Sequence, residues 1–141
     1  MLRFLLVTLL LATSCSSRTD AQQIEKQLDL YASYVRTANY FGIASLFTED
    51  GILEPAIKGT KAIQQHLSDT GKLKVVEYSL NPDPPVITNN AATQSIVYQQ
   101  RLRTPQGSTV EINGRLTLAW QRGPSGRWLI SRMSTSSAQQ P

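Results

Sequence analysis

VEINGRLTLAWQ, residues 110–121, alternates between apolar and mostly polar side chains. Its first face carries Val110, Ile112, Gly114, Leu116, Leu118 and Trp120, and its second carries Glu111, Asn113, Arg115, Thr117 and Gln121. Because successive side chains of a strand point to opposite faces, this pattern predicts a long strand in an antiparallel sheet with one face covered. The strand would exceed the usual length of about 5 to 6 residues, so Gly114 is expected to mark a bend or a bulge.

Further strands are predicted on both sides of this one. They are Lys72–Leu80, Val86–Thr88, the stretch that contains Ile96, Tyr98 and Leu102, and Arg127–Met133. Turn-forming residues separate them, including the prolines within residues 81–85, Asn89-Asn90, Pro105-Gln106-Gly107 and Gly123-Pro124-Ser125-Gly126. The second half of the chain is therefore expected to form one curved antiparallel sheet.

The first half of the chain is predicted to be mainly helical. Its apolar residues recur at steps of four and three, which places them in one stripe on a helix: Ile24, Leu28, Tyr31, Val35 and Ala38. Asp20 is a residue type that caps helix N-termini, so the helix is expected to begin there.

Three shorter elements are expected to follow this helix. They are a helix over Tyr40–Phe47, a strand over Gly51–Glu54 that ends at Pro55, and a helix over Lys61–Ser68 that is capped by Thr60 and ends at Gly71. A long sheet that curls around helices makes a cone. The fold class predicted from the sequence is α+β, a cone-shaped fold with three N-terminal helices packed on a curved antiparallel sheet.

The N-terminus has the pattern of an export signal. A short region with Arg3 precedes the apolar run Phe4–Ala12, and small residues follow up to Cys15. The apolar run is too short to span a bilayer, which takes about 20 residues as a helix. Leu11-Ala12-Thr13-Ser14-Cys15 resembles the bacterial lipobox, which implies cleavage before Cys15 and its lipidation.

Cys15 is also the only cysteine, so the chain cannot form an intrachain disulfide. The alternative interpretation is an ordinary signal peptide with an incidental cysteine near its cleavage site. Ser16 after the cysteine is compatible with an outer-membrane lipoprotein that faces the periplasm.

These segments divide the chain into four parts. Residues 1–14 are interpreted as a lipoprotein signal peptide, and residues 15–22 as the lipidated cysteine and a polar tether. Residues 23–134 are long enough to bury the core of one domain. Residues 135–141 are expected to be a disordered tail because they are rich in serine and glutamine and offer nothing to bury.

The net charge of +4 is concentrated late in the chain. After residue 100, Glu111 is the only acid among the basic residues Arg101, Arg103, Arg115, Arg122, Arg127 and Arg132. No nucleic-acid-binding motif accompanies them, so nucleic acid is not predicted as a partner. Two interpretations stay open: a solvated face of the sheet, or attraction to anionic lipid head groups or an anionic ligand. With a single histidine and scattered acids, neither a metal site nor a cofactor is predicted.

Four stretches carry a resemblance to a known superfamily. They are Tyr31–Tyr34, Gly42–Gly51, Gly59–Ile63 and Gly126–Ile130. Together with the order of the elements, they resemble the nuclear transport factor 2-like superfamily, which includes SnoaL-like polyketide cyclases and ketosteroid isomerases. Because this fold hosts enzymes, binding modules and adaptors, an activity must be argued from the site.

The resemblance to ketosteroid isomerases implies two site residues. Glu54, before Pro55, matches the acid that shuttles a proton, and Tyr31 matches the tyrosine that donates a hydrogen bond to the enolate oxygen. The chain departs from that family because the spacing from Phe47 to the acid is one residue shorter and because the acid is Glu. Tyr31 as a core residue and Glu54 as a solvated strand end are the structural alternatives.

Other candidate residues have simpler interpretations. Tyr98 and Trp120 lie on the inner face of the predicted sheet, where they would line a pocket with Tyr31 and Glu54. Asp50 is expected to shape a turn, and the only histidine, His66, is expected on a solvated helix face.

The hypothesis from the sequence is an envelope lipoprotein with a SnoaL-like pocket domain that binds a small, largely apolar molecule. One alternative is an isomerase or cyclase with Glu54 as base and Tyr31 as oxyanion donor. Another is a protein-interaction module of the envelope, with a homodimer as one form. The sequence leaves open whether the domain is an enzyme.

Overall fold

The computed structural model describes residues 13–137, with side chains from Arg18 onward. Three helices lie in this part of the chain: α1 (Thr13–Arg36), α2 (Tyr40–Ser45) and α3 (Thr60–Thr70). It also contains the strands β1 (Phe47–Leu53), β2 (Ile57–Lys58), β3 (Lys74–Pro82), β4 (Val86–Thr88), β5 (Ala91–Arg103), β6 (Thr109–Arg122) and β7 (Trp128–Ser137). None of the helices described is long and apolar enough to cross a membrane.

The strands form one curved sheet in the order β2-β1-β7-β6-β5-β3, with β4 paired to β5. Neighbours from β3 to β7 are antiparallel, as the alternating pattern predicted. The expectation of an entirely antiparallel sheet is wrong, because β1 pairs with β7 in parallel. Parallel neighbours need a long crossover connection, and here the crossover contains α3 and all the remaining strands.

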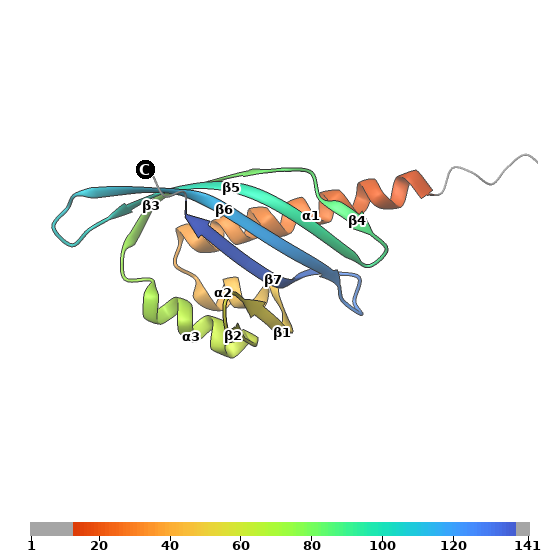
Figure 1. Cartoon of the computed structure of the whole chain (residues 1–141), viewed down its shortest axis with the longest axis horizontal. Coiled ribbons are helices and arrows are strands. Elements are labelled where there is room, and N and C mark those ends of the chain that lie inside the picture. The colour runs from red at the N-terminus through yellow and green to blue at the C-terminus, as the bar shows by residue number, and fades with distance from the viewer. Residues whose placement is uncertain (1–12, 138–141) are drawn as a thin grey trace, which may run out of the picture.

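The helices occupy the concave side of the sheet. Figure 1 shows the long strands β5, β6 and β7 arching over α1, with α2, α3 and the small β1–β2 hairpin grouped beneath them. The predicted α+β class is therefore confirmed, as are the three helices and the curved sheet.

One end of the domain is filled by large side chains. Trp120, Trp128, Ile24 and Leu118 are at most 1% exposed. Asp20 ties α1 to this end, since its carboxylate accepts a hydrogen bond from Trp128 Nε1 at 3.3 Å and forms an ion pair with Arg122. The Arg122 guanidinium in turn lies 5.0 Å from the centre of the Trp128 ring.

The start of α1 differs from the prediction. The helix already includes Thr13, the first described residue, so Asp20 lies inside it and is not its N-cap, and the segment 15–22 expected as a tether is helical. Because Asp20 packs on Trp128 and Arg122, the packed domain includes residues before the expected boundary at residue 23. Most of the signal segment, residues 1–12, and the side chain of Cys15 lie outside what the structure describes.

The end of the sheet also differs. β7 continues to Ser137, which pairs with Gly114 of β6, so residues 135–137 belong to the sheet and not to a disordered tail. The last four residues, 138–141, lie outside the described residues. A smaller correction concerns α3, whose N-cap is Gly59 with a positive φ of 95°, while Thr60 is its first helical residue.

Gly114 does not form a bulge against β5. Pairing between β5 and β6 continues through it without a shift, and the irregularity in β6 lies between Ala119 and Trp120, opposite β7. A Cβ atom on Gly114 would lie 2.6 Å from the Tyr98 hydroxyl oxygen. The glycine therefore leaves room for the Tyr98 side chain on the inner face of the sheet.

Candidate functional site

The other end of the domain is open and contains a cavity of about 660 Å³. It lies between the C-terminal half of α1, the helices α2 and α3, and the inner faces of β1, β3, β5, β6 and β7. Pockets for small molecules typically measure about 300 to 1,000 Å³. The cavity is therefore large enough for a small organic ligand.

Most of the cavity wall is apolar. Ile63 and Leu67, one turn apart on α3, face it from one side, and Leu116 and Met133 face it from the sheet. Ile63, Leu116 and Met133 are at most 3% exposed, so this part of the wall is well packed behind its surface. Such a wall favours a ligand with an apolar body.

Three of the four tyrosines that line the wall form a tyrosine cluster: Tyr31 of α1, Tyr78 of β3 and Tyr98 of β5. The ring centres of Tyr31 and Tyr78 are 6.1 Å apart in an edge-to-face arrangement, and those of Tyr78 and Tyr98 are 6.1 Å apart in a stacked one. Alternation along β3 and β5 places both strand tyrosines on the inner face of the sheet. The three phenol groups thus come from elements far apart in the sequence.

The hydroxyl groups of the cluster are weakly engaged by the protein. The Tyr78 hydroxyl donates to the Tyr31 hydroxyl at 3.5 Å, and the Tyr31 hydroxyl lies 3.9 Å from Met133 Sδ. The first distance exceeds the usual O–H···O range of about 2.5 to 3.0 Å, and a thioether sulfur is a weak acceptor. The Tyr98 hydroxyl has no hydrogen-bond partner among the described residues. These groups are therefore available to a ligand or to water.

Burial keeps the tyrosine cluster uncharged to a more alkaline pH than an exposed tyrosine. It is the main cause that raises the pKa of Tyr31, of Tyr78 and of Tyr98 above the ordinary tyrosine value of 10.0. The hydrogen bond from Tyr78 acts in the opposite direction on the pKa of Tyr31, and the positive charge of Arg36 does so on the pKa of Tyr78. At neutral pH the three side chains are neutral phenols that can donate hydrogen bonds but do not serve as bases.

Three cationic residues also border the cavity, at exposed positions: Arg36 at the end of α1, Lys72 in the α3–β3 loop and Lys74 at the start of β3. The Arg36 Nε donates to the backbone oxygen of Tyr78 at 3.1 Å, which holds the guanidinium at the edge of β3. The Tyr40 hydroxyl donates to the backbone oxygen of Gly71 at 2.8 Å, which fastens the α3–β3 loop to α2. Among the described lining residues there is no Asp, Glu or His.

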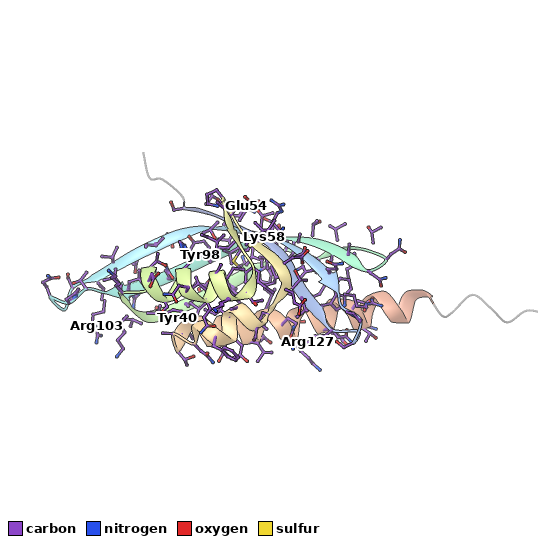
Figure 2. All side chains as sticks on the ribbon, turned by 90° about the horizontal axis from the view of Figure 1, so that it is seen from below. Tyr40, Glu54, Lys58, Tyr98, Arg103 and Arg127 are labelled. Atoms are coloured by element: carbon purple, nitrogen blue, oxygen red, sulfur yellow. The ribbon has the colours of Figure 1, made fainter. Side chains whose placement is uncertain are left out.

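The structure brings two of the four expected pocket residues, Tyr31 and Tyr98, together on the cavity wall. Glu54 is not among the described lining residues. Its carboxylate forms an ion pair with Arg132 of β7, and Figure 2 shows Glu54 at the margin of the molecule, apart from Tyr40 and Tyr98. Leu53, the last residue of β1, lines the cavity, whereas Glu54 belongs to the turn that follows the strand.

Trp120 is the other residue that the structure does not place on the cavity wall. It lies in the filled end of the domain, where its Nε1 donates to Gln94 Oε1 at 3.1 Å. Gln94 Nε2 donates in turn to the backbone oxygen of Asp83 at 2.9 Å. The face assigned to Trp120 is correct, but the cone is open only toward the other end of the strands.

Asp50 and His66 also lie away from the cavity. Asp50 is exposed and accepts a hydrogen bond from the Thr48 hydroxyl at 3.1 Å. His66 is half-buried on α3 and is not among the lining residues described. In the described part of the chain, no group of three or more His, Cys, Asp or Glu side chains is placed to hold a metal ion.

Tyr78 and the three cations were not predicted from the sequence as site residues. Tyr78 lies within the predicted strand Lys72–Leu80, and its place between Val76 and Leu80 on one face was the available signal. Arg36 follows the apolar residue Val35 on the first helix, so it looks like an ordinary polar helix end. Only the path of the α3–β3 loop brings Lys72 and Lys74 to the same opening.

Among solved structures, the chain is similar to a ketosteroid isomerase-like protein from Erwinia carotovora atroseptica, with a TM-score of 0.77 and 15% identity over 86% of this chain and 98% of the other. It is similar to a protein of unknown function from Mycobacterium tuberculosis, with a TM-score of 0.80 and 17% identity over 92% and 78%. A nuclear transport factor 2-like protein with a cystatin-like fold from Novosphingobium aromaticivorans gives a TM-score of 0.73 and 15% identity over 93% and 90%. At these identities the similarity shows the fold alone.

A comparison with curated proteins finds no match. The sequence model of the SnoaL-like domain matches residues 16–134, which is most of the chain and contains every described lining residue of the cavity except Thr135. The chain therefore belongs to the family of SnoaL-like domains.

Proposed function

We propose that this SnoaL-like domain binds a small, largely apolar molecule in its cavity and orients it by hydrogen bonds from the tyrosine cluster. The observation that carries the proposal is an open cavity of about 660 Å³ whose apolar wall contains three neutral, weakly engaged phenol groups. Apolar burial supplies most of the affinity in such a pocket, and a few polar groups fix the orientation.

A proton-shuttling isomerase or cyclase finds less support. Such a reaction needs a base within hydrogen-bond reach of the carbon acid. The described wall carries no carboxylate or imidazole, and Glu54 is paired with Arg132 outside the cavity. The open cavity also disfavours a purely structural interaction module, which would have a filled core.

Fluorescence of the neutral apolar probe N-phenyl-1-naphthylamine tests the proposal. The chain is expected to bind the probe with an increase in its fluorescence. Leu67→Trp places a larger side chain on the cavity wall and should weaken binding by roughly tenfold or more, a change of about 1.4 kcal/mol. Leu30→Trp is the matched control, because Leu30 is 40% exposed and is not a described lining residue.

Equal binding by the two tryptophan variants and the unchanged chain would place the probe outside the cavity. That result, or the absence of binding, would contradict the proposal.

We also propose that the chain is exported and anchored through a lipidated Cys15 to the periplasmic face of the outer membrane. The support is the lipobox-like sequence before Cys15 and the absence of any other cysteine. Expression in a bacterial host tests it: the intact mass of the membrane-extracted protein should equal that of residues 15–141 plus the acyl groups. Cys15→Ser should remove the acyl mass and release the protein from the membrane fraction, and an unmodified mass for the unchanged chain would refute this part of the proposal.

A further inference from the structure

The charges around the cavity are all of one sign. Arg36, Lys72 and Lys74 contribute positive charge to the lining, and the described lining residues contribute no carboxylate. Elsewhere in the described chain, Arg101, Arg122 and Arg132 are each paired with an acid. The cavity thus combines an apolar interior with a cationic border.

Arg36 is the best-defined of the three cations. Its Nε is bound to the backbone oxygen of Tyr78, while its two terminal nitrogens have no partner among the described residues. Arginine presents planar nitrogen pairs that match the oxygens of a carboxylate or a phosphate. A guanidinium held at one nitrogen and open at the others is positioned to bind such a group.

An acid that lines a neighbouring hollow together with Arg36 is already engaged. Glu77 borders a second, smaller hollow that Arg36 also lines, but its Oε1 accepts from Arg101 Nη1 at 3.0 Å. Arg101 also binds Glu111 at 3.3 Å. Glu77 therefore does not neutralise Arg36 in this structure.

Lys72 and Lys74 flank Leu73 where the chain passes from α3 into β3. Leu73 also lines the cavity and is 38% exposed, so this short segment offers an apolar side chain between two cations. The hydrogen bond from Tyr40 to Gly71 holds the start of the segment in place. Neither lysine forms an ion pair with a described residue.

We propose that the natural ligand of this cavity is an amphiphilic anion, with an apolar body against the aliphatic wall and the tyrosine cluster, and with a carboxylate or similar oxyanion at Arg36, Lys72 and Lys74. A bare anionic group would be costly in the apolar interior, so it stays at the exposed border, where the cations are. This inference rests on the proposed function and adds the chemical class of the ligand. The occupant is a free amphiphile that enters the cavity, not a lipid held in a bilayer.

Displacement of N-phenyl-1-naphthylamine by laurate and by dodecanol tests the inference, because the two share an apolar chain and differ in charge. Laurate is expected to displace the probe at a concentration roughly tenfold lower than dodecanol. Arg36→Gln should weaken the binding of laurate about fivefold and leave the binding of dodecanol nearly unchanged, as expected for loss of one partly exposed charge contact. Arg36→Lys should retain part of the preference for laurate over dodecanol.

Two further variants keep the test decisive if Arg36→Gln impairs folding. The double change Lys72→Gln and Lys74→Gln alters only exposed side chains and should also reduce the preference for laurate. Arg127→Gln is the control: Arg127 is exposed between β6 and β7, Figure 2 shows it apart from Tyr40 and Tyr98, and it is not a described lining residue. This control should leave the displacement of the probe by laurate and by dodecanol unchanged.

Equal displacement by laurate and dodecanol would overturn the inference and leave the proposed function intact, whereas failure of the probe itself to bind would overturn both. Sedimentation with phosphatidylglycerol vesicles separates the two sources of anionic head groups. Leu67→Trp should abolish laurate binding without changing vesicle binding. If Leu67→Trp spares laurate binding, or if Arg36→Gln acts on vesicle binding alone, the cationic border serves a membrane surface and the inference is wrong.

Discussion

The hydroxyl oxygens of Tyr31 and Tyr78 lie 3.5 Å apart on the cavity wall, joined by a long hydrogen bond between a helix and a strand. The two side chains are 7% and 6% exposed, so neither phenol is well solvated. This burial raises the pKa of both above 10.0, so they stay neutral to a more alkaline pH than an exposed tyrosine does. A loss of the fold at alkaline pH should therefore be linked to their ionisation.

The tyrosine cluster predicts a specific dependence of stability on pH. In the unfolded chain these phenols ionise near pH 10.0, whereas in the folded chain their pKa values are higher. Above that pH the unfolded state releases protons that the folded state retains, so the free energy of unfolding should fall as pH rises. Below that pH the phenols are neutral in both states, so the cluster should not make the free energy of unfolding depend on pH. Urea unfolding at several pH values, with tyrosinate absorbance recorded in parallel, measures both.

Tyr78→Phe supplies the comparison for this pH experiment. It removes one ionisable group and only a weak hydrogen bond, so stability at neutral pH should change by less than about 1 kcal/mol. The alkaline loss of stability should become shallower. If the free energy of unfolding falls as steeply with pH in Tyr78→Phe as in the unchanged chain, the tyrosine cluster does not cause the alkaline loss of stability.

Gly114→Ala should destabilise the domain by about 1 to 3 kcal/mol, because an added methyl group must push Tyr98 or the backbone of β7 aside. The Cβ would lie 2.6 Å from the Tyr98 hydroxyl oxygen. Gly123→Ala is the matched control, since its nearest neighbour would be at 3.5 Å, an ordinary contact. Thermal unfolding of both variants checks this prediction. Equal stability of the two would mean that the inner face accommodates a methyl group at Gly114.

Glu54→Gln should leave probe binding unchanged and cost less than about 1 kcal/mol of stability, because its partner Arg132 is 54% exposed and pairs of this kind are weak. Probe titration and urea unfolding measure the two effects. Arg132→Gln should give a similar loss of stability, since it removes the other half of the same pair. If Glu54→Gln loses probe binding and Arg132→Gln does not, the Glu54 carboxylate takes part in the binding site.

The alternation along β5 and β6 was sufficient to predict the inner and outer faces of the sheet from the sequence. The helical stripe from Ile24 to Val35 likewise predicted which side of α1 packs against the sheet. These patterns are local, and each follows directly from the geometry of one element. The order of the elements and the length of the strands predicted the cone, and the family resemblance rests on the same order.

The position of the opening could not be predicted in the same way. Both Tyr98 and Trp120 lie on the inner face, yet one lines the cavity and the other fills the closed end. The difference depends on where α3 and its loop meet the sheet, which involves contacts far apart in the sequence. The same holds for Glu54, whose pairing with Arg132 arises from the parallel contact between β1 and β7.

Asp20→Ala should destabilise the domain by about 2 kcal/mol, because it removes the partner of a mostly buried arginine. The Asp20 side chain is 13% exposed and that of Arg122 is 31% exposed, and Arg122 Nε is buried with no hydrogen-bond partner in the described chain. Loss of the carboxylate would leave that guanidinium with only the Trp128 ring beside it. Asp29→Ala, at an exposed position of the same helix, is the control and should change stability by less than about 0.5 kcal/mol. Urea unfolding of the two variants separates the outcomes: equal stability would mean that α1 is anchored from Ile24 onward and that Asp20 belongs to a tether after all.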